Sequence, residues 1–115
     1  MNTSSELDLL DFVGFFEAEP EWTHADGWHL GARFRTQRGQ DLVIATLAPF
    51  DTELSMQWWQ GEVQRLNFRA VMASGWSLQC SSQQEVLRVT FQNERVKYCS
   101  IQLKPYVAVD WVMDW

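Results

Sequence analysis

The segment LRVTFQ at residues 87–92 alternates apolar and polar side chains at every position. A period of two is typical of a β-strand that buries one face and exposes the other. Similar alternation runs through residues 28–35, 53–58, 65–69 and 99–103, and residues 42–47 form a continuous apolar run. Turn residues separate these segments at a spacing of roughly 10–13 residues. The pattern therefore predicts a mainly β fold with about eight short antiparallel strands.

Three arrangements of such strands fit the pattern: a sandwich of two sheets, an open barrel or one strongly curved sheet. Residues 62–74 leave a local choice open, because they fit a strand, a helix or a loop. A chain of 115 residues can bury a core without metal or disulfide staples, so we expect a single domain over residues 1–115. The strand region is expected over about residues 27–113.

One amphipathic helix is predicted before the strands, over about residues 5–18, which makes the fold α+β by strict count. Ser5 can cap its first turn, and Asp8 stands three residues later in a short version of the capping box. One apolar stripe follows at helical spacing, formed by Leu9, Phe12, Val13 and Phe16. Pro20 is expected to end the helix, because the residue before a proline avoids the helical region.

The net charge of −6 is unevenly distributed along the chain. Residues 1–26 hold seven acidic residues and no Lys or Arg, and the rest of the chain sums to +1. Such a field repels nucleic acid and attracts a basic partner. A solvated helix face that only aids solubility explains the same charge. Arg33, Arg35 and Arg38 form a basic edge that faintly resembles a single-strand nucleic-acid binder, but they can equally pair with the acidic N-terminal residues.

Neither a membrane segment nor a secretory signal is expected, because no apolar run approaches about 18 residues and residues 1–5 carry no basic side chain. A cytoplasmic location follows as the expectation.

Cys80 and Cys99 fall in phase with apolar neighbours, so we expect buried thiols rather than a disulfide. His24 and His29 flank Asp26 at a spacing that suits neither a strand nor a helix face for zinc.

No motif for a nucleophile, a phosphate-binding loop or paired catalytic carboxylates stands in the sequence. We therefore predict no catalytic residue, no cofactor and no metal, and a protein that is not an enzyme. Partners other than nucleic acid and membranes remain: another protein, a second copy in a homodimer, or a small apolar ligand.

Six of the seven tryptophans divide by strand phase, and the seventh, Trp111, depends on how the last strand packs. Trp28, Trp58 and Trp76 lie on the apolar side of predicted strands and are expected in the core. Trp22, Trp59 and Trp115 do not keep this phase and are candidates for a contact surface. The same contact surface is expected to include four acidic residues, Glu17, Glu19, Glu21 and Asp26. A separate apolar pocket is expected to be lined by Trp28, Phe34, Met56, Trp58 and Trp76.

Residues 22–26, Trp-Thr-His-Ala-Asp, followed by the predicted strand from Trp28, resemble the tryptophan–histidine–aspartate–alanine opening of small bacterial immunity proteins of polymorphic toxin systems. Residues 61–68, 89–91 and 98–101 are similar in rhythm, and the likeness spans residues 22–104. In that family a train of short strands follows the opening. The resemblance implies a non-enzymatic protein that binds and neutralises a toxin, and it transfers no functional residue to this chain.

Two functions follow as hypotheses. The first is a small binding protein, of the immunity type, that presents acidic and aromatic surface to a basic protein. The second is a binder of apolar small molecules, in which a curved sheet encloses the ligand and the helix acts as a lid. A homodimer without a further site is a third interpretation.

Overall fold

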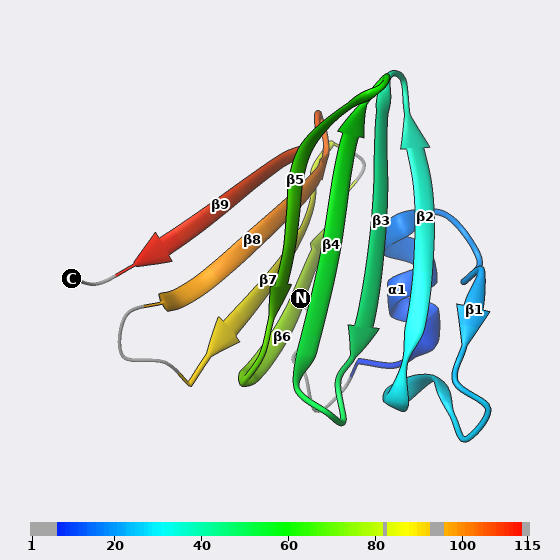
Figure 1. Ribbon diagram of the computed structural model, residues 1–115, viewed down its shortest axis with the longest axis vertical. Helices are drawn as coiled ribbons and strands as arrows, with labels where there is room; N and C mark the ends of the chain where they lie inside the picture. The colour runs from blue at the N-terminus through cyan, green and yellow to red at the C-terminus, as the bar shows by residue number, and fades with distance from the viewer. Residues whose placement is uncertain (1–6, 82, 93–95, 114–115) are drawn as a thin grey trace. The chain divides into compact units, whose positions relative to one another are not determined.

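A computed structural model describes residues 7–81, 83–92 and 96–113. Within these residues the fold is mainly β: the strands form two antiparallel sheets, one α-helix is present, and neither sheet closes into a barrel (Figure 1). The predicted fold class is thus confirmed. The chain divides into two compact units, Phe16–Val71 and the combination of Met1–Phe15 with Met72–Trp115. Whether they behave as the single expected domain stays a prediction.

The first unit contains a five-stranded sheet whose strands follow chain order, β1-β2-β3-β4-β5. Its strands are β1 Trp22–Thr23, β2 Ala32–Arg38, β3 Asp41–Ala48, β4 Glu53–Gln60 and β5 Val63–Ala70. Gly39 and Gly61 form the β2–β3 and β4–β5 turns with φ of 63° and 58°, a left-handed backbone that glycine adopts without strain. Residues 62–74, for which the sequence left a strand, a helix or a loop open, form strand β5 over most of their length.

The second unit contains a four-stranded sheet, again in chain order. Its strands are β6 Ala73–Cys80, β7 Glu85–Phe91, β8 Val96–Lys104 and β9 Ala108–Met113. Most of the LRVTFQ segment forms β7, where Leu87 and Val89 are fully buried and Arg88 and Thr90 are exposed. The turn predicted at residues 93–95 lies outside the described residues.

Burial follows the predicted period of two in both sheets. In the five-stranded sheet the buried face carries Phe34, Val43, Ala45, Leu47, Leu54 and Met56. In the four-stranded sheet it carries Trp76, Leu78, Leu87, Val89, Cys99 and Ile101. Residues 42–47 differ from the expectation of a strand covered on both faces, because Leu42, Ile44 and Thr46 are only half-buried.

The helix α1, Leu9–Phe16, is shorter than the predicted range of about 5–18. Its cap is formed by Asp8 and Asp11: the backbone N–H of each donates to the other's carboxylate, at 2.8 Å and 3.2 Å. This is a capping box that starts three residues after the predicted one, and Ser5 lies outside the described residues. Pro20 is not the residue that ends the helix, because the backbone has already left the helical region at Glu17, which has a φ of 55°.

The region before β2 corrects a second expectation. Trp28–Leu30 forms a short 3-10 helix, η1, in place of the start of a strand. A separate two-residue strand, β1, precedes it and pairs with β2 through Trp22–Arg33 and Thr23–Ala32. The period of two at residues 28–31 therefore arose by chance within a turn-like segment, and the strand begins at Ala32.

The two cysteines are free, and only Cys99 has the predicted burial. Cys80 is exposed, because it is the last residue of β6 and lies beyond the buried Leu78. The thiol of Cys80 is nevertheless partly desolvated, which raises its pKa, and the nearby Glu85 carboxylate adds to this effect. Burial, with a smaller contribution from Asp110, raises the pKa of the Cys99 thiol to about 12.

Candidate contact surface

Most of the predicted contact residues lie in one exposed stretch, residues 17–26, which is called the acidic segment below. It runs from the end of α1 through β1 towards η1 and contains Glu17, Glu19, Glu21 and Asp26. All four carboxylate residues are exposed. Glu17 has a structural role, because its carboxylate lies 3.6 Å from the Arg38 guanidinium. The expected pairing of β2 arginines with the acidic residues is thus realised at Arg38.

Trp22 is the aromatic centre of the acidic segment, and 44% of it is exposed. Its ring lies directly against Gly31, where an added Cβ would come within 2.9 Å of the indole. His24 contacts the ring edge at 6.3 Å between centroids, and the Arg33 guanidinium lies 5.7 Å from the ring centre. The half-exposed indole is thus packed by Gly31, His24 and Arg33 on three sides.

Trp58 and Trp59 both lie in β4, where the register of pairing with β5 shifts between them. Both are half-buried. The Trp58 indole N–H donates to the Asp41 carboxylate at 2.9 Å, and the Trp59 indole N–H donates to the Gln57 side-chain oxygen at 3.0 Å. The indole N–H of each of these two tryptophans therefore has a hydrogen-bond acceptor within the sheet. The structure does not bring Trp59 into the acidic segment, and Trp115 lies outside the described residues.

The residues predicted to line an apolar pocket fall in both units. Phe34, Met56, Trp58 and Trp28 belong to the first unit and Trp76 to the second. Phe34, Met56 and Trp76 are at most 6% exposed, and the other two are half-buried. Phe34 stacks on Phe16 at 4.6 Å between ring centres, and Trp76 meets Phe12 edge-on at 6.5 Å. Their role as a ligand pocket stays a prediction.

A polar hollow on the exposed face of the five-stranded sheet escaped the sequence analysis. Its volume is about 310 Å³, and it is called the Arg35 hollow below. It is lined by Glu21, Arg33, Arg35, Ile44, Thr46, Ser55, Met56, Gln57 and Asn67. Strand alternation indicates which side chains share a face, but the hollow depends on cross-strand register, which the sequence does not state.

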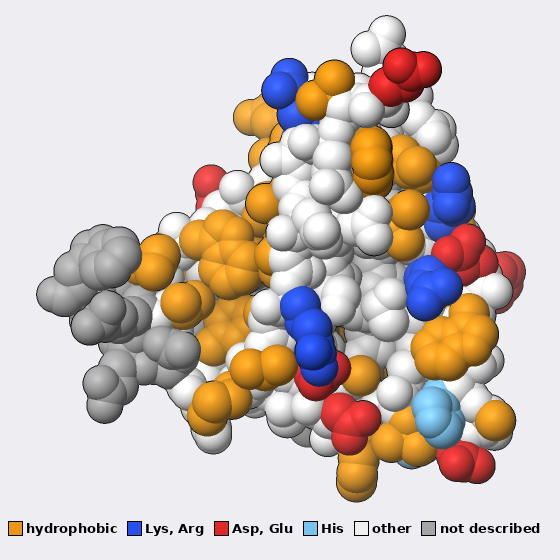
Figure 2. All heavy atoms as spheres, viewed as in Figure 1, with side chains coloured by type: hydrophobic (Ala, Val, Ile, Leu, Met, Phe, Trp, Pro, Cys, Tyr) orange, Lys and Arg blue, Asp and Glu red, His pale blue; other side chains and the backbone are white. Residues whose placement is uncertain are grey.

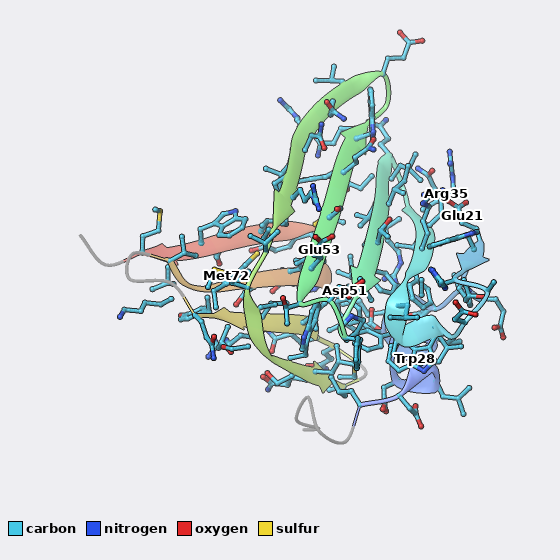
Figure 3. The ribbon with its side chains drawn as sticks, turned by 60° about the horizontal axis from the view of Figure 1, so that its bottom comes forward. Glu21, Trp28, Arg35, Asp51, Glu53 and Met72 are labelled. Atoms are coloured by element: carbon cyan, nitrogen blue, oxygen red, sulfur yellow. The ribbon has the colours of Figure 1, made fainter. Side chains whose placement is uncertain are left out.

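This face is seen from the front in Figure 2, where basic and acidic side chains lie together over β1 and β2 and uncharged side chains dominate β3–β5. Figure 3 shows Glu21 and Arg35 close together on the β1–β2 side of the sheet. The Arg35 hollow and the acidic segment therefore adjoin, since Glu21 belongs to both.

A second surface missed by the sequence analysis is the edge strand β9. Trp111, Val112 and Met113 are 37%, 37% and 41% exposed, and β9 pairs only with β8 in the described part of the sheet. The Trp111 ring stacks on Phe91 at 6.0 Å between centres. The apolar segment at residues 107–113 indicated a strand in the sequence. The pattern of residues does not show which strand forms the edge of a sheet.

His24, in the acidic segment, and His29, in η1, both contact other residues of the chain. His24 Nδ1 accepts a hydrogen bond from the Asp26 backbone N–H at 3.0 Å, and the His29 ring meets Phe50 at 5.8 Å. Among the described residues, no group of three or more His, Cys, Asp or Glu is placed to hold a metal ion. No helix in the same residues is long and apolar enough to cross a bilayer.

In sequence, no family model and no curated protein matches the chain. In structure, it matches a chain of the contact-dependent growth inhibition toxin–immunity protein complex from Klebsiella pneumoniae 342, with a TM-score of 0.80 and 12% sequence identity. The match covers 94% of this chain and 95% of that chain. The two chains thus share a fold over nearly their whole length. The fold implied by the resemblance to small β-rich immunity proteins is confirmed.

Proposed function

We propose that this chain is a non-enzymatic binding protein of the immunity type, which neutralises a basic protein partner. The observation that carries the proposal is the fold shared with a chain of a toxin–immunity complex over 94% of the sequence. A toxin inhibitor needs no chemistry of its own, because covering the partner's functional surface is sufficient. A cytoplasmic location is part of the proposal, and the two free thiols fit a reducing compartment.

The acidic segment is the proposed contact surface. It presents the exposed carboxylates of Glu19, Glu21 and Asp26 beside the pre-positioned Trp22 ring. Acidic residues increase the rate of encounter with a basic protein, and a rigid indole supplies contact area at low entropic cost. Trp22 is therefore the proposed anchor, surrounded by charges that guide the partner's approach.

Affinity capture with two charge-matched variants tests the proposal. The first carries Glu19→Gln, Glu21→Gln and Asp26→Asn; the control carries Asp51→Asn, Glu62→Gln and Asp110→Asn, which are exposed elsewhere. The wild-type chain and the control should capture the same basic protein from a lysate of the source organism. The acidic-segment variant should capture less, and the difference should shrink above about 0.1 M salt. Equal capture by both variants contradicts this contact surface.

The edge strand β9 favours self-association as a second proposal. An exposed edge with apolar side chains can pair with the same strand of another copy. Light scattering on the purified chain decides it: a mass near 13.5 kDa at all concentrations contradicts a homodimer.

A further inference from the structure

Cross-strand register aligns the side chains of the Arg35 hollow. Pairing across β2, β3, β4 and β5 puts Arg35, Ile44, Gln57 and Asn67 in one row on the exposed face. Arg33, Thr46 and Ser55 form the adjacent row. Two guanidinium groups and four uncharged polar side chains of these rows thus line one hollow, the latter being Thr46, Ser55, Gln57 and Asn67.

The two arginines differ in how they are held. The Arg33 guanidinium donates to the Thr46 hydroxyl at 3.4 Å and lies over the Trp22 ring. Arg35 is exposed, and within the described residues its guanidinium makes no hydrogen bond or ion pair. By contrast, Arg69 on the same face pairs with Glu53 at 2.6 Å. Arg35 therefore brings five free N–H donors to the hollow.

Gln57 adds a directed donor beside Arg35. Its side-chain oxygen already accepts from the Trp59 indole N–H at 3.0 Å and from the Gln64 amide at 3.4 Å. These two bonds fix which end of the amide is the oxygen. The nitrogen of the same amide is consequently left to donate towards a group bound in the hollow.

We propose that the Arg35 hollow receives the carboxylate of an Asp or Glu side chain on the protein partner. The inference rests on the proposed function and names the chemistry of one contact within it. A guanidinium fork matches a planar carboxylate with two parallel hydrogen bonds, and the Gln57 amide adds a third donor. The local charge is that of two arginines and Glu21, which leaves one positive charge for one carboxylate.

This contact complements the acidic segment. A partner that is basic overall is attracted by Glu19, Glu21 and Asp26, and a single acidic side chain entering the hollow fixes its orientation. A nucleic acid is disfavoured at the same place, because its phosphates would face Glu21 and a chain of net charge −6. The hollow thereby selects one basic protein among many, since a partner without the acidic residue leaves Arg35 unpaired under the interface.

Nuclear magnetic resonance of the full ¹⁵N-labelled chain tests the proposal without the partner. The probe is acetyl-triglutamate amide, compared with acetyl-trilysine amide and with inorganic phosphate at equal ionic strength. Arg35→Gln removes the proposed ligand. Arg65→Gln is the matched control, because Arg65 is exposed on β5, donates to the Gln60 side chain at 2.7 Å and does not line the hollow.

The triglutamate should shift the signals of Arg35, Gln57 and Asn67 saturably. Its affinity should fall about fivefold or more in Arg35→Gln and stay unchanged in Arg65→Gln. Equal loss in both variants, no saturable shift, or phosphate binding as tightly as the triglutamate would each overturn the assignment to a carboxylate. Because no partner is present, these outcomes are separate from those of the capture experiment on the acidic segment.

Discussion

The Cys99 thiol, fully buried in β8, carries a pH dependence that can be measured. Its pKa rises from an ordinary value of 9.0 to about 12 in the folded chain. As the pH rises past 9.0, the unfolded chain releases this proton first, so the free energy of unfolding falls until the folded thiol also ionises. The stabilisation is complete below pH 9.0 and is lost towards pH 12.

We predict a loss of about 1–2 kcal/mol from this thiol between about pH 8 and about pH 10.5. Urea unfolding at the two pH values should show this loss in the wild-type chain and a smaller one in Cys99→Ala. The comparison removes the contributions of all other ionisable groups, because both chains contain them. The same decrease in both chains would contradict the assignment to Cys99.

Gly31 is the residue that sets the position of Trp22. Its backbone is extended, with a φ of 166°, so alanine would be tolerated by the backbone itself. An added Cβ would lie 2.9 Å from the indole, and the ring must move. Gly31→Ala should lower stability by only about 1 kcal/mol, because the displaced ring is half-exposed.

The Trp22 indole N–H signal should nevertheless shift clearly in the nuclear magnetic resonance spectrum of Gly31→Ala, and capture of the protein partner should weaken. Gly14→Ala is the control, since nothing lies within 4 Å of a Cβ there. An unshifted Trp22 signal in Gly31→Ala would show that the ring is not held by Gly31.

At the scale of elements, the start of α1 depends on the reciprocal cap of Asp8 and Asp11. Asp8→Ala should lower the free energy of unfolding by about 1 kcal/mol, whereas Asp8→Ser should retain most of it, because a hydroxyl also accepts from the third helical N–H. Thermal unfolding of both variants checks this. If alanine and serine unfold at the same temperature, the cap contributes nothing.

Element types could be predicted from the sequence more reliably than element boundaries. The alternation at residues 87–92 and 53–58 predicted β7 and β4, because burial of one face enforces a period of two. The same alternation at residues 28–31 was misleading, since Gly31 packs under Trp22 in a turn-like segment. Ser5 and Asp8 are both suitable N-cap residues, so the sequence alone did not decide between the two possible helix starts.

At the scale of the whole molecule, the proposed function draws on two separate observations, the uneven charge and the shared fold. The uneven charge was visible in the sequence, and the acidic residues of the segment are exposed in the structure. Their role as a contact surface stays a prediction. The Arg35 hollow could not be predicted in the same way. It depends on the register that aligns Arg35 with Gln57 and Asn67 across strands more than 20 residues apart.

Growth protection is the measurement that tests the proposed function most directly. The protein captured by this chain is expressed in a susceptible bacterium alone, with the wild-type chain, and with the variant that lacks the carboxylates of Glu19, Glu21 and Asp26. We predict that the captured protein alone arrests growth, that the wild-type chain restores it, and that the variant restores it poorly. A captured protein that leaves growth unchanged, or arrest that the wild-type chain fails to relieve, would contradict the proposal that this chain neutralises a toxin.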